Sequence, residues 1–323
     1  MLDNEIIKLK PVFKDYIWGG NKIRNVLKKH TGLMTTIAES WEFSTHPDGV
    51  SYIGSGNFEG KTLKQYFDAV GWEGLGDYAV ARKQLPIMIK FIDANENLSI
   101  QVHPGDKYAL KYENDNGKNE MWYIVDAEPN AFIYLGFIRD ISKKEVAERV
   151  KNGTLEDILN KVPVKKGQSY YIPAGTVHAI GAGCLICEVQ QASNVTYRLY
   201  DYGRRDVNGK PRKLHLNSAL KVLKTKKTYL FSNKINNLFT ASSTRGKLLT
   251  RNQSFKVTRY DVKDRFSISS TSFLYSVMVV VDGRGKVSDG VEEKAIKTGD
   301  TFLLQDCHAL SISGNCVVLM ISM

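Results

Sequence analysis

The sequence predicts a mainly β protein built from two β-barrel halves, with a small helical insertion in the first half. Short runs rich in Val, Ile, Tyr and Phe alternate with turns, and the chain has 26 glycines. Such alternation is typical of sandwiches and barrels. Residues 165–172 are also similar to residues 296–304, since both pass through a Gly turn into an apolar run. This weak repeat indicates two similar halves.

Strands are expected where an apolar run is bounded by Gly, Pro, Asn or Asp. The expected strands are residues 123–125, 131–135, 169–172, 184–189, 275–281, 301–304 and 317–321. The few expected helices are residues 62–70, 142–151, 154–162 and 215–224. Ser142 and Glu145 form a capping box, and acidic residues follow Thr154 where they favour the helix dipole.

The boundary between the halves is expected in the polar stretch from Lys224 to Asn237. The first domain then spans residues 1–235 and carries the helical insertion near residues 140–162. The second domain spans residues 236–323.

The formal net charge of +11 favours anionic partners, which include nucleic acids, acidic membranes and phosphorylated metabolites. The densest basic cluster, residues 221–227, follows a short helical pattern, and no groove-reading motif accompanies it. No apolar run is long enough to span a bilayer, and the N-terminal residues do not read as a secretory signal. We therefore expect a cytoplasmic protein with a small phosphorylated ligand, no nucleic acid and no membrane. The oligomeric state is left open.

Four cysteines are too few for a disulfide scaffold. Cys184 and Cys187 form a C-x-x-C pair, but a zinc ribbon needs a second pair at matched spacing. Buried, reduced thiols are the expected state.

The clearest chemical motif is G-x5-P-x-G-x2-H, from Gly167 to His178. It predicts a strand, a tight turn at Pro173 and Gly175, and a return strand whose early side chain points inward. The imidazole of His178 would then lie in the mouth of a barrel, where ligand sites are common. Histidine is the commonest metal ligand, so the motif predicts a metal site.

A second motif places Gln101 and His103 two residues apart, so on a strand both face the same side. Leu98, Ile100 and Val102 would face the other side. Burial of an unpaired polar face costs several kcal/mol, and a metal ion would supply a partner. The alternative is that this face is exposed to solvent.

Glu120 enters an apolar strand and completes a set of two His, one Glu and one amide oxygen. Such a set suits Zn²⁺, although Mn²⁺, Fe²⁺ and Ni²⁺ fit the same ligand types. The ligands together carry one negative charge, so the bound metal would attract anionic oxygens.

The motifs taken in order resemble the type I phosphomannose isomerases, in the short form of Gram-positive bacteria. The resemblance runs over most of the chain. It is carried by residues 16–20 (YIWGG), 39–42 (ESWE), 98–104 (LSIQVHP), 119–122 (NEMW), 173–178 (PAGTVH) and 193–198 (SNVTYR).

The resemblance implies a cupin (jelly-roll) fold and one zinc ion per chain. It implies the metal ligands Gln101, His103, Glu120 and His178. The family's active-site arginine and lysine match Arg198 and Lys118, its phosphate-binding positions match Ser99 and Arg204, and Lys90 and Glu188 also fall on active-site positions. In the second half Gln305 replaces the proline and His308 is not at the matching offset, so residues 236–323 are predicted to be a metal-free cupin-like domain.

The implied reaction interconverts mannose 6-phosphate and fructose 6-phosphate through an enediol. Lys118 and Glu188 are both candidates for moving the proton, and the sequence does not choose between them. Two other hypotheses remain at this stage: an iron-dependent cupin oxygenase, and a non-catalytic sugar-phosphate-binding cupin.

Overall fold

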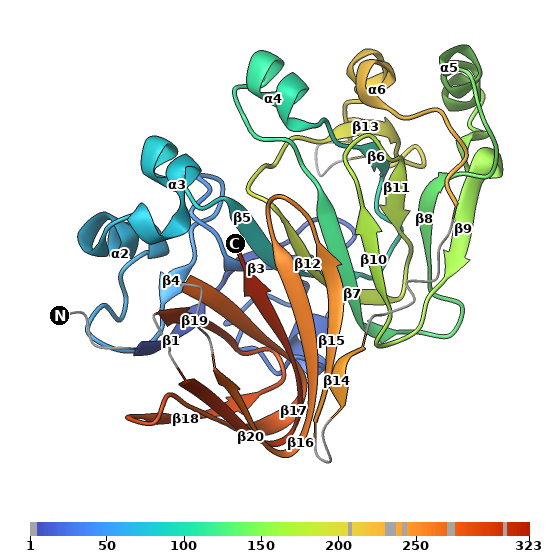
Figure 1. Ribbon diagram of the computed structural model, residues 1–323. Helices are drawn as coiled ribbons and strands as arrows, with labels where there is room; N and C mark the ends of the chain where they lie inside the picture. Colours follow the sequence, from blue (N-terminus) through green and yellow to red (C-terminus); the bar gives the residue numbers. More distant parts are fainter. Residues whose placement is uncertain (1–4, 206–208, 230–236, 241–243, 270–274, 306–308) are drawn as a thin grey trace.

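The strands of the computed structural model form three antiparallel sheets of nine, six and five strands (Figure 1). The structure describes residues 5–205, 209–229, 237–240, 244–269, 275–305 and 309–323. The predicted mainly β fold is confirmed. No helix within these ranges is long and apolar enough to cross a membrane.

The six-stranded sheet is buried on both faces along its central strands. In spatial order it consists of β10 (Ser169–Ile172), β7 (Glu120–Ala127), β12 (Cys184–Gln191), β5 (Ile87–Ala94), β3 (Glu39–Phe43) and β2 (Val12–Lys14). Successive side chains on β12 alternate between two separate cores, with Ile186 in one and Val189 in the other. Such double burial produces continuous apolar runs in place of a polar alternation.

The five-stranded sheet packs face to face against the six-stranded one. It consists of β13 (Tyr197–Tyr200), β6 (Ile100–Val102), β11 (His178–Ile180), β8 (Phe132–Phe137) and β9 (Leu159–Pro163). The core between the sheets contains Ile133 and Ile180 from this sheet and Ile124 and Ile186 from the other. The other face of the five-stranded sheet is covered by α5 (Lys143–Lys151) and α6 (Leu216–Val222).

The nine-stranded sheet contains the C-terminal strands together with the first strand of the chain. Its order is β14 (Asn237–Thr240), β15 (Thr244–Arg251), β16 (Lys256–Ser269), β20 (Ala309–Ser322), β17 (Tyr275–Ser288), β19 (Thr301–Gln305), β1 (Glu5–Lys10) and β4 (Tyr52–Ile53), and β18 (Glu293–Lys297) pairs with β17. It encloses its own apolar core, which includes Val280 and Phe302.

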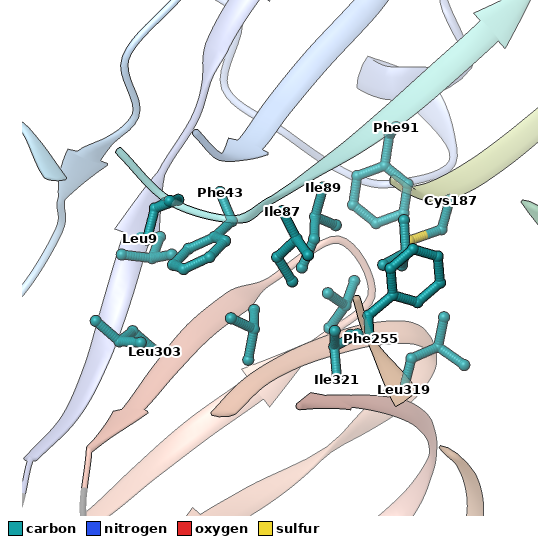
Figure 2. Close-up of a cluster of buried hydrophobic side chains, with 14 of the residues drawn as sticks. Leu9, Phe43, Ile87, Ile89, Phe91, Cys187, Phe255, Leu303, Leu319 and Ile321 are labelled. Atoms are coloured by element: carbon teal, nitrogen blue, oxygen red, sulfur yellow. The ribbon is translucent and has the colours of Figure 1, made fainter. Parts of the chain in front are cut away.

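One shared core joins the nine-stranded sheet to the six-stranded sheet. Ile89, Phe91 and Cys187 of the six-stranded sheet contact this core from one side, and Leu303 and Leu319 from the other (Figure 2). Both sets are fully buried, which excludes water from the junction. The two halves therefore pack as one body.

Three of the four expected helices are present. They are α2 (Leu63–Val70), α5 and α6. Thr62 caps α2 with a full capping box, and the Ser142 hydroxyl accepts a hydrogen bond from the Glu145 amide at the start of α5. Four short helices were not predicted: α1 (Lys22–Asn25), η1 (Glu73–Leu75), α3 (Asp77–Arg82) and α4 (Asp106–Tyr112).

The expected helix at residues 154–162 is wrong. Only a 3₁₀ turn, η2 (Leu155–Ile158), forms, and the chain then continues as strand β9. Ile133 and Tyr134 of β8 pair with Val162 and Lys161. The pairing satisfies the backbone hydrogen-bonding groups of residues 159–163 and extends the sheet. Tertiary context therefore overrides the local helix signal.

The domain boundary at residue 235 stays a prediction, because residues 230–236 lie outside the described ranges. Strand β1 pairs with β19 from Glu5–Gln305 to Lys8–Phe302. The first strand of the chain thus completes the sheet of the second half, which a division by sequence position does not anticipate.

Candidate metal centre and pocket

Three buried side chains converge between the five- and six-stranded sheets. His103 follows β6, Glu120 opens β7 and His178 opens β11. One ligand atom from each lies within 4.8 Å of the others. His103 Nε2 is 3.1 Å from Glu120 Oε1, and His178 Nε2 is 3.6 Å from Glu120 Oε2. Within the described ranges this is the one such group of His, Cys, Asp or Glu found.

Strand register explains why residues distant in sequence meet here. Gln101 has His178 as its cross-strand partner on one side and Arg198 as its partner on the other. Gly175, in the turn before His178, has a φ of 85° and donates its amide to the His103 carbonyl at 2.8 Å. Glycine tolerates this left-handed backbone, and the turn thereby fixes both histidine segments together.

Backbone carbonyls orient both imidazoles. His103 Nδ1 lies 2.7 Å from the Val195 carbonyl and His178 Nδ1 lies 2.8 Å from the Thr176 carbonyl. A carbonyl only accepts, so each Nδ1 carries the hydrogen and each Nε2 presents a lone pair toward Glu120. This carbonyl support of the far ring nitrogen is typical of metal-ligating histidine.

The donor set fits a metal ion. Glu120 Oε1 is buried in an ion pair with Lys118, while Glu120 Oε2 and His178 Nε2 are buried without a hydrogen-bond partner. Burial of such atoms without a partner is costly, and a cation among them would satisfy both. Gln101 lies beside them on β6, where its amide oxygen is a further possible ligand.

Electrostatics hold these groups in the protonation states that metal binding requires. Burial and the charge of Lys118 lower the pKa of His103 to about 4, and burial lowers that of His178. Burial disfavours the charge on Glu120, but Lys118 and His103 outweigh it and hold its pKa well below the usual range. Neutral imidazoles beside a carboxylate are the forms that coordinate metals.

A pocket of about 350 Å³ opens beside the metal centre. Six of the predicted site residues line it: Lys90, Ser99, Gln101, Lys118, Glu188 and Arg198. His178 contacts the pocket wall through Trp122, whose ring centroid lies 5.5 Å from the imidazole. The structure therefore places most of the predicted site residues around one cavity.

One wall of the pocket is a row across the six-stranded sheet. Lys90 is the cross-strand partner of both Trp41 and Glu188, and Glu188 is the partner of Trp122. The Trp122 indole donates to Glu188 Oε1 at 2.8 Å, and Lys90 Nζ lies 4.2 Å from the Trp41 ring centroid. Burial and the negative charge of Glu120 raise the pKa of Glu188 to about 7.

Lys118 lies between the metal centre and the pocket. Its ammonium is 2.7 Å from Glu120 Oε1 and 3.4 Å from His103 Nε2. Burial opposes its charge, but the attraction of Glu120 and Glu188 prevails and raises its pKa. Lys118 is therefore a fixed positive charge at neutral pH.

Arg198 and Ser99 line the pocket beside Gln101. Arg198 Nε donates to Ser99 Oγ at 3.2 Å, and Nη1 donates to the Lys213 carbonyl at 3.0 Å. Arg204, predicted to bind phosphate, is not part of the pocket lining. Its Nη1 donates to the Asn97 carbonyl and its Nη2 to Asp201 Oδ1, both at 2.6 Å.

Several lining residues were missed as site residues. Tyr16, Trp18 and Glu39 line the pocket and lie within the quoted YIWGG and ESWE motifs, so those motifs were the available signal. Arg212 also lines the pocket, but it lies in a basic loop segment with no pattern that distinguishes it from surface arginines.

Comparison with known proteins agrees with this geometry. A family model described as the catalytic domain of type I phosphomannose isomerase matches residues 6–134. Mannose-6-phosphate isomerase of Streptococcus mutans is 34% identical over 89% of this chain and 88% of its own. The enzyme ManA of Bacillus subtilis is 33% identical over 94% of each chain. The crystal structure of the Bacillus subtilis mannose 6-phosphate isomerase matches with a TM-score of 0.89 and 31% identity, over 98% of this chain and 99% of that one.

A paired-sheet cupin fold with a buried His-Glu-His cluster beside a polar pocket defines a metal-binding cupin enzyme. The extent and identity of the matches then show the family: the chain belongs to the type I phosphomannose isomerases.

Proposed function

We propose that this protein interconverts mannose 6-phosphate and fructose 6-phosphate, with one Zn²⁺ per chain. The observation that carries the proposal is the buried His103, Glu120 and His178 cluster, which adjoins a cationic pocket in a chain of this family. Gln101 is the proposed fourth ligand. When bound, the metal would supply Lewis-acid polarisation of the sugar oxygens.

Isomerisation requires a proton to leave C2 of the aldose and to arrive at C1. Glu188 is the better proton carrier of the two candidates, because its pKa of about 7 lets it accept and return a proton at neutral pH. The raised pKa of Lys118 keeps that side chain charged. Lys118 and Arg198 therefore stabilise the negative charge that grows on the enediol oxygens.

Residues of the pocket lining would hold the substrate in place. Ser99 is a proposed phosphate-binding residue and accepts a hydrogen bond from Arg198, and Lys90, also in the lining, has its Nζ 3.4 Å from Glu39 Oε2. A phosphate fixed at one end orients the sugar toward the proton carrier, which lowers the entropic part of the barrier. The net charge of +11 favours capture of a dianionic substrate.

We also place the protein in the cytoplasm. The thiols of Cys184, Cys187 and Cys316 are free and buried. Cys184 and Cys187 belong to different cores on opposite faces of β12, so they do not form a joint metal or redox pair. Free thiols of this kind are typical of reducing compartments.

The test combines metal analysis with a coupled assay on purified protein. We expect close to one zinc per chain and turnover of mannose 6-phosphate that a chelator abolishes and zinc restores. Stoichiometric zinc without turnover of mannose 6-phosphate would reject the isomerase and favour a sugar-phosphate-binding cupin. Stoichiometric iron with oxygen consumption would favour an oxygenase.

A further inference from the structure

A second cavity lies at the junction between the two halves of the molecule. Its volume is about 450 Å³, and none of its described lining residues belongs to the pocket beside the metal centre. The first half contributes residues 8–11, residue 13 and residues 27–30, and the second half contributes the turn between β18 and β19. Small-molecule sites are common at such junctions and in this range of volume.

The two halves are in close contact at Gly299. Its φ is 90°, and an added Cβ would lie 2.5 Å from the Leu27 carbonyl oxygen, so only glycine fits there without a shift. Lys29 Nζ donates to the Gly299 carbonyl at 2.6 Å and lies 2.9 Å from the fully buried Glu42 carboxylate. These contacts hold the segments from the two halves against each other on one side of the cavity.

Three of the five lysines around this cavity already have carboxylate partners. Lys8 Nζ lies 2.8 Å from Asp300 Oδ1, which belongs to the one carboxylate among the described lining residues. Lys10 pairs with Glu59 at 3.0 Å, but both side chains are 57% exposed, so that pair contributes little. The third is Lys29, through the buried ion pair described above. Neighbouring carboxylates therefore balance three of the positive charges.

The other two lysines give the cavity an excess of positive charge. Lys28 and Lys297 are exposed, and neither forms an ion pair with a carboxylate within the part of the chain that the structure describes. His30 also lines the cavity and offers a further polar nitrogen. Unbalanced charge of one sign in a cavity attracts counter-ions. A ligand with more than one negative charge would suit both lysines.

The lining also includes an apolar surface. Leu9 and Leu27 are buried, whereas Pro11 and Phe13 are partly exposed. An inorganic anion would leave these side chains in contact with water. A flat aromatic ring would cover them and could stack on Phe13. Unpaired cations and an apolar surface in one cavity are the two features that a nucleotide requires.

We propose that this cavity binds a nucleoside diphosphate, with its phosphates at Lys28 and Lys297 and its base against Phe13. The proposal is independent of the sugar-phosphate reaction, because the described residues of the cavity and those of the pocket beside the metal centre are different. Both halves line the cavity, so the bound nucleotide would also stabilise the junction between them.

Calorimetry on the full chain tests the proposal with ADP, GDP, UDP and CDP in turn, and with pyrophosphate and the matching nucleoside as fragments. At least one diphosphate should bind with a Kd below about 1 mM, and more tightly than either of its fragments. That nucleotide should also raise the melting temperature, because it binds the folded state.

Lys28→Asn and Lys297→Ala should each weaken this binding about 10-fold or more, because each removes a charged hydrogen-bonding partner. Lys28 has a left-handed backbone with φ of 54°, which asparagine tolerates, so the first variant removes the charge without added strain. Both variants should keep the wild-type kcat and KM when no nucleotide is present.

Two further variants serve as controls. Lys263→Ala removes an exposed lysine of β16 that also forms no ion pair within the described ranges but lies outside the cavity lining. It should bind the nucleotide as the wild type does. Arg198→Ala removes a cation of the pocket beside the metal centre and should also bind the nucleotide normally.

Three outcomes would overturn the proposal. The first is a Kd above about 1 mM for all four diphosphates. The second is pyrophosphate that binds as tightly as the nucleotide, since the apolar surface would then have no part in binding. The third is nucleotide binding that both lysine variants retain. Failure of the proposed reaction would look different, because the wild type would then lack turnover while the pattern of nucleotide binding persisted.

Discussion

The two halves of the molecule enclose opposite kinds of interior. The nine-stranded sheet surrounds a mainly apolar core, which includes Val262, Met278 and Phe302. The space between the five- and six-stranded sheets contains apolar residues at one end and buried Lys90, Glu120 and Glu188 at the other.

This difference shows that the charged groups of the proposed active site lower the stability of the first half. Removal of a charged group from water costs several kcal/mol, which only close partners or a metal can offset. In the first half the partners are present as alternating charges on neighbouring strands. The second half has the apolar interior and shares a large core with the first. We therefore expect substitutions in the first interior to remove function, and those in the second to remove stability.

The largest expected effect follows removal of a metal ligand. His178→Ala should lose the metal and reduce turnover to background, because it removes one of the three side chains whose ligand atoms converge on the site. Metal content and coupled turnover are the measurements. A variant that retains one metal per chain would show that His178 is not a ligand.

Arg198→Ala should retain the metal and still lose turnover. Removal of a charged group that stabilises the transition state costs about 100- to 1,000-fold in kcat. Arg198→Lys keeps the charge and should recover part of the loss. A near-normal rate in Arg198→Ala with normal metal content would contradict the role given to Arg198.

Glu188→Gln should change the pH profile as well as the rate. With a pKa of about 7, Glu188 becomes an effective base only as pH rises through neutrality, so wild-type kcat/KM should rise through that range. The amide cannot accept the proton, so this limb should disappear and kcat should fall about 100-fold or more. An unchanged limb in the variant would assign the titration to another group.

Met278→Ala tests the second interior. Met278 is fully buried among apolar side chains, so its truncation should lower the free energy of unfolding by about 2–5 kcal/mol. Chemical denaturation measures this change. Metal content and kcat of the folded variant should match the wild type, and a selective loss of metal would show that the halves are coupled more closely than their cores indicate.

The sequence predicted the strands and the metal cluster better than the pocket. His103, Glu120 and His178 follow turns and strands with strong local signals, and the structure brings them together. Arg212 and the placement of β1 beside β19 depend on contacts between distant segments, which no local pattern encodes. The wrong helix at residues 154–162 has the same origin, because the acidic residues after Thr154 favour a helix locally but the pairing with β8 decided the structure.

The smallest expected effect concerns a buried carboxylate of the first half that serves no proposed catalytic role. Asp93 lies at the end of β5 and accepts the Lys22 amide at 2.6 Å, while its Oδ1 has no hydrogen-bond partner. Burial raises its pKa to about 6. The folded protein then binds more protons than the unfolded chain between about pH 4 and 6, so this group lowers stability as pH rises through that range, by at most about 3 kcal/mol.

Asp93→Asn cannot ionise and removes this dependence. Relative to wild type, the variant should therefore gain about 1–3 kcal/mol of stability at pH 8 compared with pH 4, whatever its absolute cost. Asp68→Asn is the opposite control, because the hydrogen bond from Lys64 lowers the pKa of Asp68 and the charged form is the favoured one. If both variants shift in the same direction with pH, burial does not govern the ionisation of Asp93.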